Sequence, residues 1–162
     1  ILMISGTFVF PYRGMLIPAN EYNIPTEVME ISRIIEEDYG ETLETPAQKM
    51  LDKRVALPYD LELRLRTYDA SLSYGISRNA YIYINENGLY TNKKKYNTEE
   101  YVIRAIVCGY QEDAKKLRKC IDKLEIKYFV TSKTFEMDEY FAQINCYPIG
   151  TTGTYEVYKV EK

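Results

Sequence analysis

The chain of 162 residues contains no histidine and no tryptophan. Histidine is the usual general base, the usual partner in a nucleophile triad and the most common nitrogen ligand of metal ions. Its absence therefore removes the main residue of all three kinds of site. This weighs against an independent hydrolase. We expect this chain to carry no catalytic residues, no cofactor and no metal.

Cysteine is scarce, with only Cys108, Cys120 and Cys146. Three scattered cysteines are too few for a disulfide framework and lack the spacing of a zinc site. Cys120 falls in step with Leu117 and Ile121 on one helical face, so we expect it to be a small buried apolar group.

Long apolar runs and an excess of basic charge are also missing. No internal segment approaches the roughly 18 apolar residues of a membrane span. The net charge of −3 gives no basic field for a phosphate backbone, so we expect no nucleic-acid partner. The GTTG at positions 150–153 lacks the lysine of a phosphate-binding loop, and a strand follows it instead of a helix. We expect one domain over residues 1–162.

The first residues, ILMISG, lack an initiating methionine, and we expect the chain to be a piece of a longer protein. Residues 1–5 fit either the last turn of a preceding transmembrane helix or a first strand. Positions 1–32 contain one basic residue, Arg13, against three acidic ones. Because cytoplasmic flanks of spans are enriched in lysine and arginine, a span upstream would place this domain outside the cytoplasm.

Hydrophobic periodicity alternates between helix and strand along the chain. It predicts helices over 24–40, 45–51, 60–66, 98–109, 111–125 and 134–145. It predicts strands over 54–58, 79–88 and 126–132, and a final hairpin around the GTTG turn. The segment 60–66 also alternates as a strand would, but its apolar residues share a helical face and we favour a helix. The fold class is therefore α/β, a mixed sheet covered by helices in two or three layers, with a C-terminal antiparallel hairpin.

Tyrosine is abundant, at 17 residues, and two tyrosines flank Asp69 in the stretch LRTYDASLSYGISR. A tyrosine ring stacks on a sugar face, a carboxylate accepts sugar hydroxyls, and a guanidinium orients the carboxylate. The candidate ligand-binding residues of this stretch are Arg66, Tyr68, Asp69, Tyr74 and Arg78. The alternative is that Asp69 caps a helix or turn beginning at Ala70, with Arg66 paired to it at the surface. Because aspartate caps turns far more often than it forms sites, the capping interpretation is the stronger one.

Several motifs in a fixed order carry a resemblance to a known group of proteins. The matching pieces are 20–31, 54–58, 66–75, 126–130 and 154–160, read as NEYNIPTEVMEI, RVALP, RTYDASLSYG, IKYFV and TYEVYKV. Together they resemble the soluble C-terminal region of bacterial multi-pass membrane proteins of the GT-C glycosyltransferase type and their uncharacterised relatives. In that pattern an arginine directly follows Tyr-Gly, whereas here Ile76 and Ser77 precede Arg78, which puts a role for Arg78 in doubt.

The resemblance implies an extracytoplasmic domain of a membrane enzyme that uses a lipid-linked sugar. In such enzymes the catalytic acids lie in loops between membrane spans, so this domain would be accessory and non-catalytic. Its partners would be a glycan or lipid-linked sugar and the membrane domain of the same protein, in cell-surface polysaccharide or glycolipid assembly. The other hypothesis is a free-standing cytoplasmic α/β domain that binds a nucleotide or a protein partner.

Overall fold

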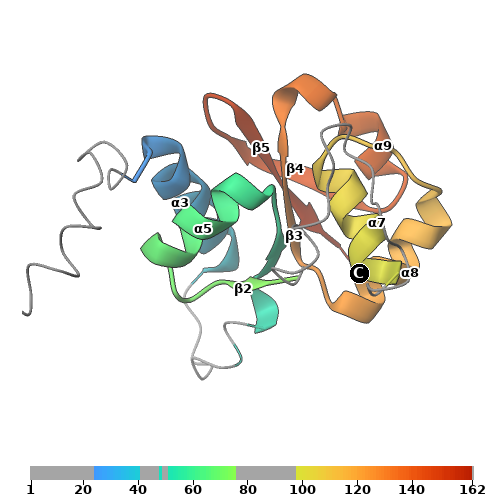
Figure 1. Cartoon of the computed structure of the whole chain (residues 1–162), viewed down its shortest axis with the longest axis horizontal. Helices are drawn as coiled ribbons and strands as arrows, with labels where there is room; N and C mark the ends of the chain where they lie inside the picture. The colour runs from blue at the N-terminus through green and yellow to red at the C-terminus, as the bar shows by residue number, and fades with distance from the viewer. Residues whose placement is uncertain (1–23, 41–47, 49–50, 76–97, 162) are drawn as a thin grey trace, which may run out of the picture.

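A computed structural model describes residues 24–40, 48, 51–75 and 98–161 (Figure 1). The α-helices in these ranges are α3 (Thr26–Tyr39), α5 (Tyr59–Tyr68), α7 (Thr98–Val107), α8 (Ala114–Leu124) and α9 (Asp138–Ala142). The strands are β1 (Arg54–Ala56), β2 (Ser73–Tyr74), β3 (Tyr128–Ser132), β4 (Cys146–Thr151) and β5 (Tyr155–Val160). None of the described helices is both long and apolar enough to cross a membrane.

The strands form one five-stranded mixed sheet in the order β2-β1-β3-β5-β4. Strand β1 pairs in parallel with both β2 and β3, while β5 is antiparallel to β3 and forms a hairpin with β4. The register between β4 and β5 shifts between Pro148 and Gly150. The predicted α/β class, the mixed sheet and the C-terminal antiparallel hairpin are confirmed.

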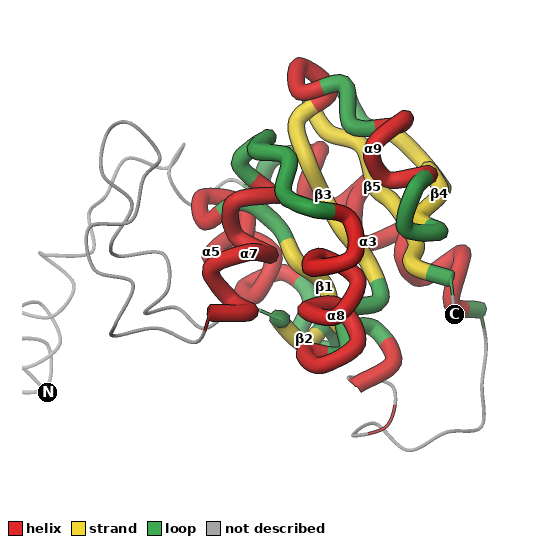
Figure 2. Tube along the Cα trace, turned by 90° about the vertical axis from the view of Figure 1, so that its right-hand side faces the viewer, coloured by secondary structure: helices red, strands yellow, loops and turns green. Residues whose placement is uncertain are grey.

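Helices cover both faces of this sheet, so the three-layer alternative applies. Figure 1 shows α3 and α5 on one side of the strands and α7, α8 and α9 on the other; Figure 2 gives the perpendicular view. Side-chain alternation along β1 produces this arrangement, because successive strand residues point to opposite faces. Val55 packs into the core under α3 and α5, while the next residue, Ala56, packs into the core under α7, α8 and α9.

Proline and glycine set the ends of α3 as the sequence predicts. The helix begins directly after Pro25 and ends at Tyr39, and Gly40 follows with a positive φ of 74°, which glycine adopts most easily. Helix α5 is also a helix as favoured, and it begins after Pro58. Helix α7 is followed by Gly109, where φ is 84° and the Phe135 ring lies so close that a Cβ atom would clash with it.

The predicted helix over 134–145 is shorter than expected. A 3₁₀ helix spans Lys133–Phe135, Glu136 has a left-handed φ of 49°, and α9 then covers only Asp138–Ala142. The apolar face that suggested one long helix is still buried, because its four residues come from α9 and the turns beside it. They are Met137, Tyr140, Phe141 and Ile144.

Three free cysteines lie in the described ranges, and two of them are buried. Cys120 packs in the core with Leu117 and Ile121, which confirms the prediction from its helical spacing. Burial raises the pKa of its thiol. Burial also raises the pKa of Cys146 to about 12, so both buried thiols are protonated and unreactive at neutral pH.

Other expectations fall outside the described residues. These are the predicted strand over 79–88, the N-terminal segment 1–5 and most of the short helix predicted over 45–51.

A trio of aromatic rings fills the core under α9. The centroid of the Phe141 ring lies 4.4 Å from that of Tyr158 and 5.2 Å from that of Phe129, and all three side chains are buried.

We expect Phe141→Ala to lower the free energy of unfolding by about 3–5 kcal/mol, because it removes a buried ring and leaves a cavity. Urea denaturation measures the change. Tyr147→Ala, at an exposed position of β4, is the control and should cost less than about 1 kcal/mol. Equal losses for the two variants would contradict this account of the core.

Candidate functional site

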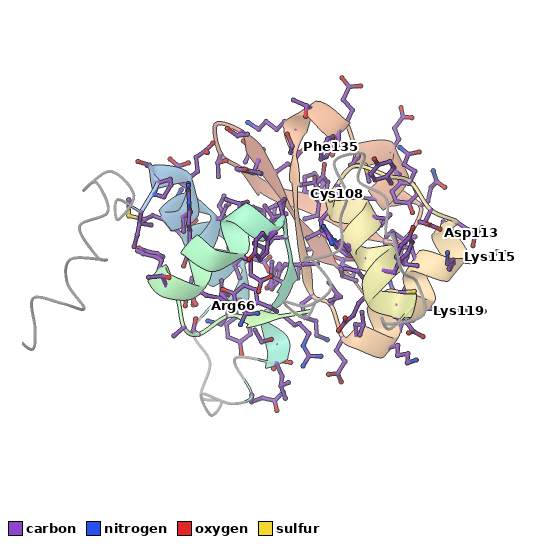
Figure 3. All side chains as sticks on the ribbon, in the orientation of Figure 1. Arg66, Cys108, Asp113, Lys115, Lys119 and Phe135 are labelled. Carbon is purple, nitrogen blue, oxygen red and sulfur yellow. The ribbon has the colours of Figure 1, made fainter. Side chains whose placement is uncertain are left out.

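Four of the predicted site residues lie at the C-terminal end of α5 and in β2, an outer strand of the described sheet. Arg66 and Tyr68 lie in the last turn of α5, Asp69 follows the helix directly, and Tyr74 belongs to β2. Arg66 is labelled in Figure 3, at the lower edge of the layer formed by α3 and α5. Arg78 lies outside the described residues.

Arg66 is held between Glu62 and Tyr74. Its Nε donates a hydrogen bond of 2.6 Å to Oε1 of Glu62, and its NH2 lies 2.6 Å from the same oxygen. The guanidinium carbon sits 3.9 Å from the centre of the Tyr74 ring, at cation–π distance. Sequence reasoning expected Arg66 to orient Asp69, but its ion-pair partner is Glu62, one helical turn earlier.

Two oxygen atoms beside this guanidinium have no hydrogen-bond partner within the part of the chain that the structure describes. Glu62 is only 2% exposed and its Oε2 accepts nothing, and the hydroxyl of Tyr74 is likewise buried and unpaired. Burial raises the pKa of the Tyr74 phenol well above its ordinary value, and the charges of Glu62 and Asp69 add to the effect against the opposing charge of Arg66. Tyr74 is therefore neutral across the physiological range, with an unused donor and acceptor.

Tyr68 differs from Tyr74 because its ring is turned outward. Its side chain is 43% exposed at the C-terminal end of α5. We call Glu62, Arg66, Tyr68 and Tyr74 together the Arg66 surface. It combines an exposed aromatic ring, a fixed guanidinium and unpaired oxygen atoms.

Asp69 faces another way, into the turn that leads to β2. Its Oδ1 accepts hydrogen bonds from the backbone N–H of Ser71 at 2.8 Å and from the Ser71 hydroxyl at 2.6 Å. Its Oδ2 accepts a hydrogen bond of 2.6 Å from the Ser32 hydroxyl of α3. These contacts agree with the capping interpretation, in which the carboxylate fixes the turn that begins at Ala70.

Sequence reasoning missed the lysine that completes this arrangement. Lys53, directly before β1, is 2% exposed and donates to Oε1 of Glu36 and, at 2.6 Å, to the Ser71 hydroxyl. A buried ammonium group requires such partners. We call Ser32, Glu36, Lys53, Asp69 and Ser71 the Lys53 network. The only sequence signal for it was a charged residue at the start of a buried strand.

The pairing of Ser71 with Lys53 resembles a nucleophile and its base, but its surroundings do not favour that chemistry. The Lys53 nitrogen contacts the Glu36 carboxylate as well as the Ser71 hydroxyl. The same hydroxyl lies within hydrogen-bond distance of the carboxylates of both Glu36 and Asp69. The Lys53 network is therefore best understood as a cross-link between α3, β1 and the turn before β2.

No three histidine, cysteine, aspartate or glutamate residues within the described ranges converge to hold a metal ion. Comparisons with protein-family models, with curated proteins and with solved structures found no match to this chain. The chemistry of the described residues and the resemblance carried by the sequence motifs therefore supply the case for a function.

The Asp69 carboxylate should stabilise the fold in a pH-dependent way. Burial alone would raise its pKa, but hydrogen bonds from Ser32 and Ser71 and the charge of Lys53 outweigh burial, and the pKa is lowered from its ordinary value of 3.8. The stabilisation by the Asp69 carboxylate is thus complete above pH 3.8 and is lost as the pH falls through the lower pKa of the folded chain.

We expect Asp69→Asn to lower the free energy of unfolding by about 1–2 kcal/mol at pH 7, because it removes the charge that these hydrogen bonds stabilise. The loss is modest because the site is partly exposed.

Urea denaturation at pH 7 and near the acid limit measures this difference. The gap between the wild-type chain and the Asp69→Asn variant should shrink in acid, where both side chains are uncharged. Glu37→Gln, which removes an exposed ion pair with Arg33, is the control and should have little effect at either pH. A gap of the same size in acid would show that shape, and not charge, is what the turn requires.

Proposed function

We propose that this chain is a non-catalytic, extracytoplasmic accessory domain of a membrane protein that assembles cell-surface polysaccharide or glycolipid. In this proposal the Arg66 surface recognises an acceptor glycan or a lipid-linked sugar. The observation that carries it is the fixed stack of Arg66 on Tyr74, together with the exposed ring of Tyr68 in the same helical turn as Arg66. The membrane context rests on the resemblance of the sequence motifs.

The hydrogen bonds of Arg66 leave part of its guanidinium available. Nε and NH2 are directed to Glu62, whereas NH1 has no partner among the described residues. An arginine already immobilised by an ion pair and a ring loses little further freedom when it binds a ligand. Such a group suits sugar hydroxyls or a phosphate of a lipid-linked sugar.

Tyr68 supplies the apolar component that sugar recognition needs. A sugar ring has an apolar face of C–H groups, and an exposed aromatic ring stacks against it while neighbouring polar groups bind the hydroxyls. Tyr68 and Arg66 are two residues apart in the last turn of α5, so their side chains leave the helix on different sides. A ligand that contacts both must therefore extend around the C-terminal end of the helix, as an oligosaccharide can.

The non-catalytic part of the proposal has two supports. The chain has no histidine to act as a general base at neutral pH. Among the described residues, Ser71 is hydrogen-bonded to Lys53, but both side chains are also held by the Glu36 carboxylate and Ser71 by that of Asp69, as expected of a structural cross-link. Catalysis by the parent protein would then reside elsewhere.

Glycan binding can be tested with this chain alone. We would apply the labelled chain to an array of bacterial surface-polysaccharide fragments and measure the affinity of any retained fragment by calorimetry. We expect Arg66→Ala and Tyr68→Ala each to weaken binding about tenfold or more, which corresponds to the loss of about 1.4 kcal/mol. Arg64→Ala, at an exposed position of the same helix, is the control for charge and should bind as the wild type does. No retention of any fragment, or unchanged affinity of Arg66→Ala, would reject a glycan site here.

The membrane context is tested separately, by determining the gene sequence upstream of Ile1 and searching its translation for apolar segments. The proposal expects several apolar segments of about 20 residues, the last of them leading into ILMI. A start codon immediately before Ile1, with no such segments, would instead favour a free-standing α/β domain that binds a nucleotide or a protein.

A further inference from the structure

A hollow without any carboxylate lies beside α8, on the face of the sheet opposite to the Arg66 surface (Figure 1). Its volume is about 270 Å³, and its lining residues come from the first turns of α8 and from the turn between α9 and β4: Ala114, Lys115, Arg118, Gln143, Ile144 and Asn145. Two of these side chains are cationic and two are amides. We call it the basic hollow. In a chain with a net charge of −3, this lining favours an anionic ligand.

Arg118 is held in place at this hollow by groups from three parts of the chain. Its NH1 donates hydrogen bonds to the backbone oxygens of Ile144 at 3.2 Å and Glu161 at 2.7 Å. Its Nε donates to Oδ1 of Asp122 at 3.1 Å. Its NH2 has no partner within the described ranges, and 29% of the side chain is exposed. The guanidinium is therefore fixed before binding, with one nitrogen left to donate to a ligand.

Lys115 supplies a second positive charge that no carboxylate of the described residues neutralises. Lys116 and Lys123 on the same helix each form an ion pair. Lys115 and Lys119 are exposed and have no such partner in the part of the chain that the structure describes, and Figure 3 shows both on the same side of α8. Of these two, only Lys115 lines the basic hollow.

Asn145 adds a neutral donor to the two cations. It has a left-handed φ of 56°, and its exposed side-chain amide has no hydrogen bond to any described residue. Asp113, two residues before Lys115, does not oppose these donors from inside the hollow. Its Oδ1 accepts a hydrogen bond of 2.9 Å from the backbone N–H of Lys116, so it caps the helix and is not among the lining residues.

A second hollow of different character meets the first at Arg118, which lines both. Its volume is about 310 Å³, and its charged lining residues besides Arg118 are Asp122, Glu125, Lys127 and Glu161, beside the apolar Ile121, Ile126 and Val160. Carboxylates accept hydrogen bonds from hydroxyl groups, and apolar side chains suit the C–H face of a sugar ring. We call the two hollows together the α8 groove. A matching ligand has an anionic group at one end and hydroxyl groups at the other.

We propose that the α8 groove binds a sugar phosphate, with the phosphate in the basic hollow and the sugar ring in the second hollow. NH2 of Arg118 and the ammonium group of Lys115 bind the phosphate oxygens, and the amide of Asn145 donates a further hydrogen bond. Arginine binds phosphate through its planar set of donors, and lysine binds it as a point charge. The carboxylates of the second hollow bind the sugar hydroxyls and disfavour a second anionic group there.

This inference goes beyond glycan recognition at the Arg66 surface and does not depend on it. The α8 groove and the Arg66 surface share no residue, and they lie on opposite faces of the sheet. Binding in the groove is followed through the amide signals of its own residues, so that either proposal can fail without the other.

Nuclear magnetic resonance titrations of the isotope-labelled chain test the proposal, with glucose-1-phosphate, inorganic phosphate and glucose compared at constant ionic strength. We expect saturable shifts centred on the amides of Lys115, Arg118 and Asn145. Glucose-1-phosphate should bind at least about threefold more tightly than inorganic phosphate, because both hollows contribute to its binding. Glucose alone should give no saturable response.

Three variants locate the binding site. Lys115→Ala should weaken binding of glucose-1-phosphate at least about fivefold, since it removes one of the two cations. Asn145→Gly removes the amide and keeps a backbone conformation that glycine adopts easily, and should weaken binding about twofold or more. Lys119→Ala makes the same charge change one helical turn away, outside the groove. It is the matched control and should alter the affinity less than about twofold, because solvent and salt screen an exposed charge.

Equal losses for Lys115→Ala and Lys119→Ala would show a general attraction of anions to α8, and would overturn the proposal. Equal affinities for inorganic phosphate and glucose-1-phosphate would reject the sugar part of the site. Sedimentation with phosphatidylglycerol vesicles, compared with phosphatidylcholine vesicles, tests a lipid as the source of the phosphate. Lys115-dependent retention on the former without any response to glucose-1-phosphate would overturn the proposal in favour of a membrane surface. A far-ultraviolet circular dichroism spectrum of each variant establishes that it is folded before its affinity is compared.

Discussion

The buried ammonium group of Lys53 is the constraint around which one half of the molecule is arranged. A charge that is almost completely removed from water must be surrounded by acceptors, or the chain does not fold around it. The acceptors come from Glu36 on α3 and Ser71 in the turn before β2. Satisfying one charge therefore fixes a helix, the start of the central parallel strand and the turn leading to the edge strand relative to one another.

The positions of the side chains in the Arg66 surface depend on that arrangement. The position of β2 beside β1 depends on the turn held by Asp69, and β2 supplies the Tyr74 ring on which Arg66 stacks. Glu62, on the buried side of α5, then determines the direction of the guanidinium. The side chains that we propose bind a glycan are thus already oriented by the fold, which would lower the entropic cost of binding.

Sequence patterns predicted those elements whose residues interact locally or repeat regularly. The apolar period of α3 and α8, the stops at Gly40 and Gly109, and the terminal hairpin were all accessible in this way. The Glu62–Arg66 ion pair could also be predicted, because residues four apart on a helix are neighbours. The sequence prediction instead paired Arg66 with Asp69. The partners of Lys53 lie 17 and 18 residues away and follow no period, so only the folded chain reveals them. The long helix predicted over 134–145 failed for a related reason, since its apolar spacing is the same whether or not a left-handed residue interrupts it.

The irregular strand β4 has a consequence for the behaviour of the chain in solution. It is the last strand in the described sheet, and an outer strand with a free row of backbone groups is a template for another chain. Pro148 has no backbone N–H to offer, and the register shift between Pro148 and Gly150 disturbs the regular spacing that a foreign strand would need. These two features protect this edge against intermolecular strand addition, and hence against aggregation that begins from the native state.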